Sequence, residues 1–149
     1  MVLRRTIMNI GFYVDSLEGT PETIELYKSL NKLVENKTVD DVSLFYNKVN
    51  FNPEQPKFGV FNSTETWCFT GTLIVTRIEN VKKVQSVVNK AKVVYLYDKR
   101  DRNVFDLISL SGDIPVIAKT KEDAEYIYRV SGKPVRSVAA SVEEILEVI

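Results

Sequence analysis

The feature that most constrains this fold is a regular alternation of short apolar runs with longer amphipathic stretches, which continues to the last residue. The runs "MNIGFYV" (8–14) and "VVYLY" (93–97) have the length and the β-branched or aromatic content of strands buried on both faces. Between such runs, apolar residues recur at helical spacing, as at Ile78, Val81 and Val84. This alternation predicts a mostly parallel sheet with helices on both faces, because right-handed crossovers carry successive helices over the sheet.

The predicted domain is a single three-layer Rossmann-like α/β unit over residues 8–149, with a sheet of about six or seven strands. The candidate strands lie near residues 8, 42, 58, 72, 93, 115 and 135. A doubly wound sheet that starts in its middle has the strand order 3-2-1-4-5-6-7. Residues 1–7, "MVLRRTI", precede the first strand and have two interpretations, a loose extension or a wrongly assigned start ahead of Met8.

Capping residues mark the predicted helix starts and stops. Thr20 followed by Pro21 begins the first helix, Thr120 and Ser141 begin the last two, and Gly132 ends the helix between them.

The least regular region lies between residues 58 and 71. "FGVF" (58–61) has the character of a short strand, and Asn62 or Ser63 can cap one or two helical turns through Trp67 before Gly71 opens the next strand.

In the helix that follows Arg77, we expect the apolar stripe to extend through Val88 and Ala91.

The composition excludes several chemistries. Histidine is absent, so Ser-His-Asp catalysis, Cys-His catalysis and histidine zinc sites cannot be built within this chain. Cys68 is the single cysteine, and we expect it to be a small buried hydrophobe. No apolar run approaches the roughly 20 residues that span a bilayer, and the first residues lack a secretory apolar segment. These features predict a cytoplasmic protein without a membrane partner.

A ligand site in a doubly wound sheet lies beyond the carboxyl ends of the strands, where the strand order reverses. In the predicted order this crevice lies between the strands near residues 8 and 72. The candidate ligand-binding residues follow these strand ends and the next one: Asp15, Ser16, Gly19, Thr20, Thr76, Arg77, Asp98 and Lys99.

The turn "VDSLEGTPE" (14–22) is a poor phosphate loop. It has one glycine, and the chain contains neither G-x-G-x-x-G nor G-x-x-x-x-G-K-[ST]. Its acids would repel a phosphate, so Asp15 is better suited to the hydroxyls of a small polyhydroxylated ligand or to a divalent ion. The alternative is that Asp15 or Ser16 only satisfies backbone amides of the turn.

Neither a cofactor nor a metal site is predicted. In "DKRD" (98–101), Lys99 and Arg100 separate the two acids and oppose a bound cation.

Charge is unevenly distributed, although twenty basic and twenty acidic residues cancel overall. Residues 77–102 contain eight basic and three acidic residues, a net charge of plus five, whereas residues 15–41 contain seven acidic and three basic residues, a net charge of minus four. The overall balance argues against a nucleic-acid partner. The basic region can bind a phosphate-bearing partner, solvate a helix face, or meet the acidic region of another copy. Tyr95 and Tyr97 share one strand face, which favours a core role over base stacking.

Two stretches carry a family resemblance. "FTGTLIVT" (69–76) and "PVIAKTKEDAEYIYRVSGKPV" (115–135) resemble the amino-terminal Rossmann-like half of GT-B glycosyltransferases. The chain from Met8 is also similar to small proteins of large tailed bacteriophages, particularly marine ones, which would place it in the host cytoplasm. GT-B enzymes close two such domains around a cleft, and the donor nucleotide sugar sits mainly on the carboxyl-terminal domain.

Three functions remain open. The first is a non-catalytic binding or assembly module, a half-GT-B domain that acts as an oligomer or with a second protein chain; the missing second domain, the lack of histidine and the lack of a phosphate loop favour it. The second, which the resemblance implies, is a glycosyltransferase-like enzyme completed by a second chain or by homodimerisation. Asp15 would be its base, and Arg77 or Lys99 would contact the phosphates of a nucleotide sugar. The third is a nucleic-acid or host-protein binder that uses residues 77–102.

Overall fold

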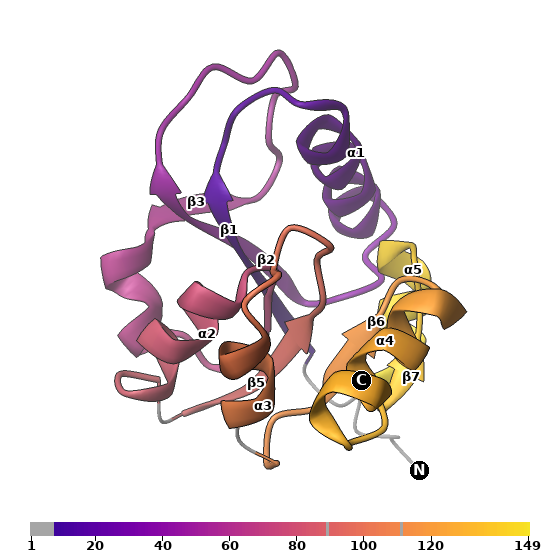
Figure 1. Ribbon diagram of the computed structural model, residues 1–149. Coiled ribbons are helices and arrows are strands. Elements are labelled where there is room, and N and C mark those ends of the chain that lie inside the picture. The colour runs from indigo at the N-terminus through magenta and orange to yellow at the C-terminus, as the bar shows by residue number, and fades with distance from the viewer. Residues whose placement is uncertain (1–7, 89, 111) are drawn as a thin grey trace, which may run out of the picture.

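A computed structural model describes residues 8–88, 90–110 and 112–149 of the chain. Within them, seven parallel strands form one sheet in the order β3-β2-β1-β4-β5-β6-β7 (Figure 1). The strands are β1 (Asn9–Ser16), β2 (Asp41–Lys48), β3 (Gly59–Asn62), β4 (Gly71–Val75), β5 (Ala91–Leu96), β6 (Val116–Ala118) and β7 (Ser137–Val138). The predicted fold class and strand order are confirmed. The prediction for residues 1–7 lies outside the described residues.

Helices cover both faces of the sheet and complete the three layers. One face packs against α1 (Pro21–Glu35) and α5 (Val142–Val148). The other packs against the remaining helices, which are η1 (Ser63–Cys68), α2 (Ile78–Gln85), α3 (Val104–Ser109) and α4 (Lys121–Ser131). None of these described helices combines the length with the apolar character that a membrane crossing requires.

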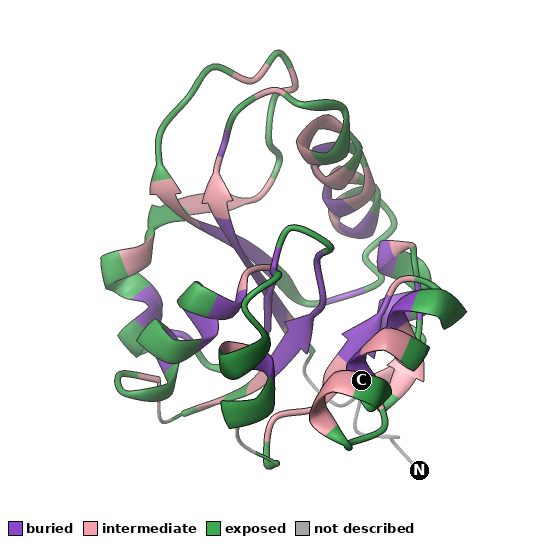
Figure 2. Ribbon diagram, in the orientation of Figure 1, coloured by how far each residue is buried: buried purple, intermediate pink, exposed green. Residues whose placement is uncertain are grey.

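The core lies in two layers on either side of the sheet; the central strands β1, β2 and β4 are mostly buried, and the edge strands β3 and β7 are not (Figure 2). Successive residues of β1 supply both layers, since Phe12 packs toward α1 and Tyr13 toward α2, each at 1% exposure. Burying a large apolar side chain contributes roughly 1.5–3 kcal/mol. Gly11 allows the close approach of Phe69, whose ring would lie 2.9 Å from a Cβ added at that position.

Capping bonds hold the predicted helix starts. The hydroxyl of Thr20 accepts a hydrogen bond from the backbone N–H of Thr23 at 3.3 Å, and Thr120 and Ser141 cap α4 and α5 in the same way. Gly132 ends α4 in the left-handed conformation, with φ of 74°.

Asn62 ends β3 and caps η1, so the short strand and helical turns expected between residues 58 and 68 are confirmed.

Two expectations are wrong. The helix after Arg77 ends at Gln85, and Ala91 opens β5 instead of continuing the helix, because pairing with Gly71 in β4 holds it in the sheet. Cys68 is exposed instead of buried, since it is the last residue of η1, a short 3-10 helix in which only Thr66 is buried.

Candidate functional site

The point at which the strand order reverses lies between β1 and β4. The two strands pair in parallel from Ile10 with Thr72 to Tyr13 with Val75, so their carboxyl ends reach the same edge. The chain leaves β1 toward α1 on one face and leaves β4 toward α2 on the other. The polar side chains at this edge form two groups, one around Asp15 and one around Asp101.

The turn after β1 uses Ser16 internally. The hydroxyl of Ser16 accepts hydrogen bonds from the backbone N–H of Glu18 at 3.1 Å and from the side-chain amide of Asn50 at 3.0 Å. Ser16 therefore satisfies a backbone amide of the turn and ties the turn to the loop that follows β2.

Gly19 and Thr20 are also structural in this arrangement. The N–H of Gly19 donates to the carbonyl of Phe51 at 2.9 Å, and a Cβ at Gly19 would lie 2.9 Å from the Pro53 ring. The hydroxyl of Thr20 caps α1 by accepting a hydrogen bond from the N–H of Thr23. The loop between β2 and β3 thus already uses the N–H of Gly19, which a bound phosphate would need as a donor.

The first polar group, the Asp15 cluster, contains Tyr13, Asp15, Asn47 and Asn80. The hydroxyl of Tyr13 donates to Asn47 Oδ1 at 2.5 Å. Asn47 Nδ2 donates to Asp15 Oδ1 at 3.0 Å and to Asn80 Oδ1 at 2.9 Å. The side chain of Asp15 is 44% exposed, and its other oxygen lies 3.8 Å from the ammonium of Lys48.

Asn80 has an unusual environment within this cluster. The residue is 1% exposed, and its Nδ2 has no hydrogen-bond partner in the part of the chain that the structure describes. A buried amide donor without a partner costs about 1–3 kcal/mol, so such atoms are uncommon in folded proteins.

Sequence reasoning found Asp15 but missed Tyr13, Asn47 and Asn80. A usable signal existed for one of them. The residues before and after Asp15 pair with Tyr46 and Lys48 of β2, so Asn47 stands beside Asp15 at the same phase of the side-chain alternation.

The second polar group, the Asp101 cluster, contains Arg77, Ile78, Tyr95 and Asp101. The carboxylate of Asp101 is fully buried. It accepts hydrogen bonds from Arg77 Nε at 2.8 Å, from the backbone N–H of Ile78 at 2.9 Å and from the hydroxyl of Tyr95 at 2.5 Å. Burial and the Asp101 carboxylate raise the pKa of Tyr95 well above its usual range.

Asp101 performs a task that the sequence before α2 leaves undone. Arg77 occupies the N-cap position of α2 and makes no capping bond with its side chain. Asp101, from the loop between β5 and α3, accepts from the first N–H of the helix instead. The carboxylate therefore fixes this loop against α2.

Asp98 in the same loop is paired as closely. Its two oxygens accept from the backbone N–H, Nε and Nη2 of Arg100 at 2.8, 3.0 and 2.7 Å. Burial acts to raise the pKa of Asp98, but the hydrogen bonds and positive charge of Arg100 outweigh it and leave this pKa below the usual range. Burial, together with the nearby Tyr126 and acidic side chains, raises the pKa of Tyr97 to about 12.

The remaining predicted residues divide between structure and surface. Both the N–H and the hydroxyl of Thr76 donate to the carbonyl of Tyr13 at 3.1 Å, which joins β4 to β1 beyond their last paired residues. Lys99 is 68% exposed, with its ammonium 4.0 Å from Asp123. Of the predicted acids, Asp15 combines solvent access with a hydrogen bond from a side-chain amide, while Asp98 belongs to a closed pair with Arg100.

Comparisons with known proteins give no significant match to any family model, to any curated protein or to any solved structure. Arguments about function therefore rest on the site itself.

Proposed function

We propose that this protein is a non-catalytic binding module that holds a small polyhydroxylated ligand against the Asp15 cluster, as a domain of the GT-B-half type would at its strand ends. One observation carries the proposal: Asp15 is 44% exposed within an amide network, whereas the carboxylate of Asp101 is fully buried and paired. The accessible group is therefore an acceptor that still has room for a partner.

Hydroxyl groups match the Asp15 cluster in chemistry. A carboxylate can accept several hydrogen bonds, so ligand hydroxyls can donate to Asp15 beside the bond from Asn47, whose two amide hydrogens are already used by Asp15 and Asn80. Each such bond contributes about 0.5–1.5 kcal/mol net, or more when one partner is charged.

The glycosyltransferase-like alternative receives less support. It requires Arg77 or Lys99 to contact donor phosphates. Lys99 is exposed, but Arg77 is bonded to buried Asp101, and its Nη2 lies 3.8 Å from Glu79 Oε1. Breaking a buried ion pair costs about 3–5 kcal/mol, which a phosphate contact would have to recover.

The basic region at residues 77–102 also receives less support as a binding surface. Arg77, Lys82 and Arg100 are each paired with a carboxylate, so part of the positive charge is matched within the chain. Local pairing of this kind weakens the field that would attract nucleic acid.

Amide-resolved NMR titration tests the proposal. The probes are glucose, galactose and mannose, which lack phosphate, and UDP-glucose, which carries it. We expect at least one hexose at millimolar concentration to shift amides near residues 15–20 and 47–51. Asp15→Asn should abolish these shifts, and the control Glu18→Gln, which removes an exposed charge from the same turn, should retain them.

Two results would contradict the proposal. One is the absence of hexose-dependent shifts near Asp15. The other is binding of UDP-glucose about tenfold tighter than the hexoses, a difference of about 1.4 kcal/mol, which would favour the enzyme alternative.

A further inference from the structure

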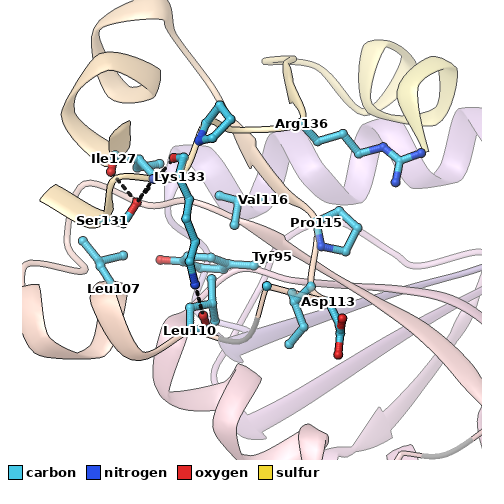
Figure 3. A pocket seen from close by; sticks show the side chains of 13 residues that line it. Tyr95, Leu107, Leu110, Asp113, Pro115, Val116, Ile127, Ser131, Lys133 and Arg136 are labelled. Atoms are coloured by element: carbon cyan, nitrogen blue, oxygen red, sulfur yellow. Dashed lines mark hydrogen bonds between the residues drawn. The ribbon is translucent and has the colours of Figure 1, made fainter. Parts of the chain in front are cut away.

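A cavity of about 330 Å³ (Figure 3) lies at the amino-terminal ends of β6 and β7, whereas the Asp15 cluster lies at the carboxyl-terminal end of β1. It is a partly open hollow between the carboxyl-terminal ends of α3 and α4 and the residues that lead into β6 and β7. Its walls are mainly apolar, with Leu107, Leu110, Val116 and Ile127 among them. The ring of Tyr95 also lines the cavity, while its hydroxyl is bonded to Asp101.

Two cations, Lys133 and Arg136, line this cavity; in Figure 3 the guanidinium of Arg136 extends away from the Tyr95 ring, whereas Lys133 lies beside it. The side chain of Lys133 extends past the Tyr95 ring, and its ammonium donates to the backbone carbonyl of Leu110 at 3.1 Å (Figure 3). No carboxylate in the described part of the chain pairs with this ammonium. Figure 3 shows the carboxylate of Asp113 directed away from it, although Asp113 lines the same cavity. An ammonium has three donors, so two remain for a ligand.

Three carbonyls near Lys133 and the end of α4 already accept hydrogen bonds. At the end of α4, the N–H of Gly132 donates to the carbonyl of Tyr128 at 2.8 Å, and the hydroxyl of Ser131 donates to the carbonyl of Ile127 at 2.6 Å. The carbonyl of Leu110 has Lys133 itself. The ammonium of Lys133 is therefore a positively charged donor beside the cavity.

We propose that this cavity is a second binding site, which takes a small amphipathic carboxylate. Its hydrocarbon part would lie between Leu107, Val116 and Ile127, and its carboxylate would pair with Lys133. The volume is at the lower end of the range for small-molecule pockets, roughly 300–1,000 Å³, so a short aliphatic or single-ring acid fits better than a lipid or a nucleotide. The site is independent of the Asp15 cluster, because the two lie at opposite ends of the strands.

Titration with hexanoate, and with hexanol as the uncharged analogue, tests this site. We expect saturable binding of hexanoate and at least about tenfold weaker binding of hexanol. Lys133→Met should weaken hexanoate binding by about the same factor of ten. Arg129→Met, which removes an exposed cation from the last turn of α4, should bind hexanoate as the unmodified chain does. Val116→Phe, which fills the cavity and keeps the charge, should also lose binding.

A measurement on the unmodified chain guards against variants that fail to fold. Nuclear Overhauser contacts should connect the methyl group of hexanoate with methyl groups of Leu107 and Ile127. The proposal is overturned if hexanoate does not saturate, if hexanol binds equally well, or if these contacts are absent.

Discussion

Each of the two polar groups at the carboxyl ends of the strands contains an aspartate, and one of these aspartates is buried and the other exposed. Asp101 has a fully buried carboxylate that accepts from Arg77, Ile78 and Tyr95. Asp15 is 44% exposed and shares one amide of Asn47. The Asp101 cluster joins a loop to a helix, so its bonds contribute to the fold, whereas the Asp15 cluster retains an accessible acceptor.

This difference shows why a carboxylate at a strand end does not by itself indicate a binding site. Asp98 and Asp101 follow β5 at the edge where doubly wound sheets bind ligands, but Arg100 and Arg77 occupy their oxygens. The degree of internal pairing, more than position, separates the structural acids from the candidate site.

The largest expected effect comes from breaking the Asp101 cluster. Asp101→Asn should lower the free energy of unfolding by about 3–5 kcal/mol, because Arg77 would lose its buried ionic partner. The first turn of α2 would also lose the negative charge that caps it. Urea unfolding measures this change. Asp106→Asn, which removes the surface pair with Lys82, is the matched control and should cost about 0–1 kcal/mol. Equal effects of the two variants would contradict the structural role of Asp101.

A smaller effect, with a defined pH dependence, is expected at Asp98. The pKa of Asp98 is lowered in the fold, so its ionised form stabilises the protein above the unfolded pKa of about 3.9, and this contribution is lost as the pH falls toward the folded pKa. Asp98→Asn should therefore cost about 2 kcal/mol at neutral pH, and the difference from the unmodified chain should shrink in acid. Urea unfolding across this pH range checks it; a difference that grows in acid would have the wrong sign.

Most of the fold could be predicted from the sequence, because it depends on repeated local signals. Apolar runs, helix caps such as Thr20 and Thr120, and the turn at Gly132 each act over a few residues. The early end of α2 was missed because Val88 and Ala91 continue a helical pattern that strand pairing overrides.

Less of the candidate site could be predicted, because its contacts join segments that are far apart in the sequence. The "DKRD" run (98–101) gave no sign that Asp101 turns inward to Arg77 and Tyr95, since a loop has no periodicity that shows side-chain direction. Asn80 on α2 and Asn47 on β2 are brought together only by the packing of α2 on the sheet.

The Asp101 side of the edge should also contain tyrosines that ionise late. The pKa of Tyr97 is raised to about 12, so its neutral form stabilises the fold up to the unfolded pKa of about 10, and this contribution is lost as the pH rises toward 12. Following phenolate absorbance during an alkaline titration should show one fewer late-titrating group in Tyr97→Phe. An unchanged late phase in this variant would contradict the assignment.

The smallest expected effect on stability is at Asp15. Because Asp15 is 44% exposed and Lys48 lies at 3.8 Å in an exposed pair, Asp15→Asn should change the free energy of unfolding by no more than about 0.5 kcal/mol. Urea unfolding beside Asp101→Asn gives the contrast directly. A loss at Asp15 as large as that at Asp101 would give both acids a structural role.

The central claim is that the Asp15 carboxylate is free to bind a ligand and the Asp101 carboxylate is committed to the fold. Carboxyl carbon NMR resonances report both groups in one unmodified sample during titration with glucose, galactose and mannose. We expect saturation with a bound hexose to change the carboxyl carbon chemical shift of Asp15 and to leave that of Asp101 unchanged. Movement of the Asp101 resonance, or a stationary Asp15 resonance with all three sugars, would contradict it.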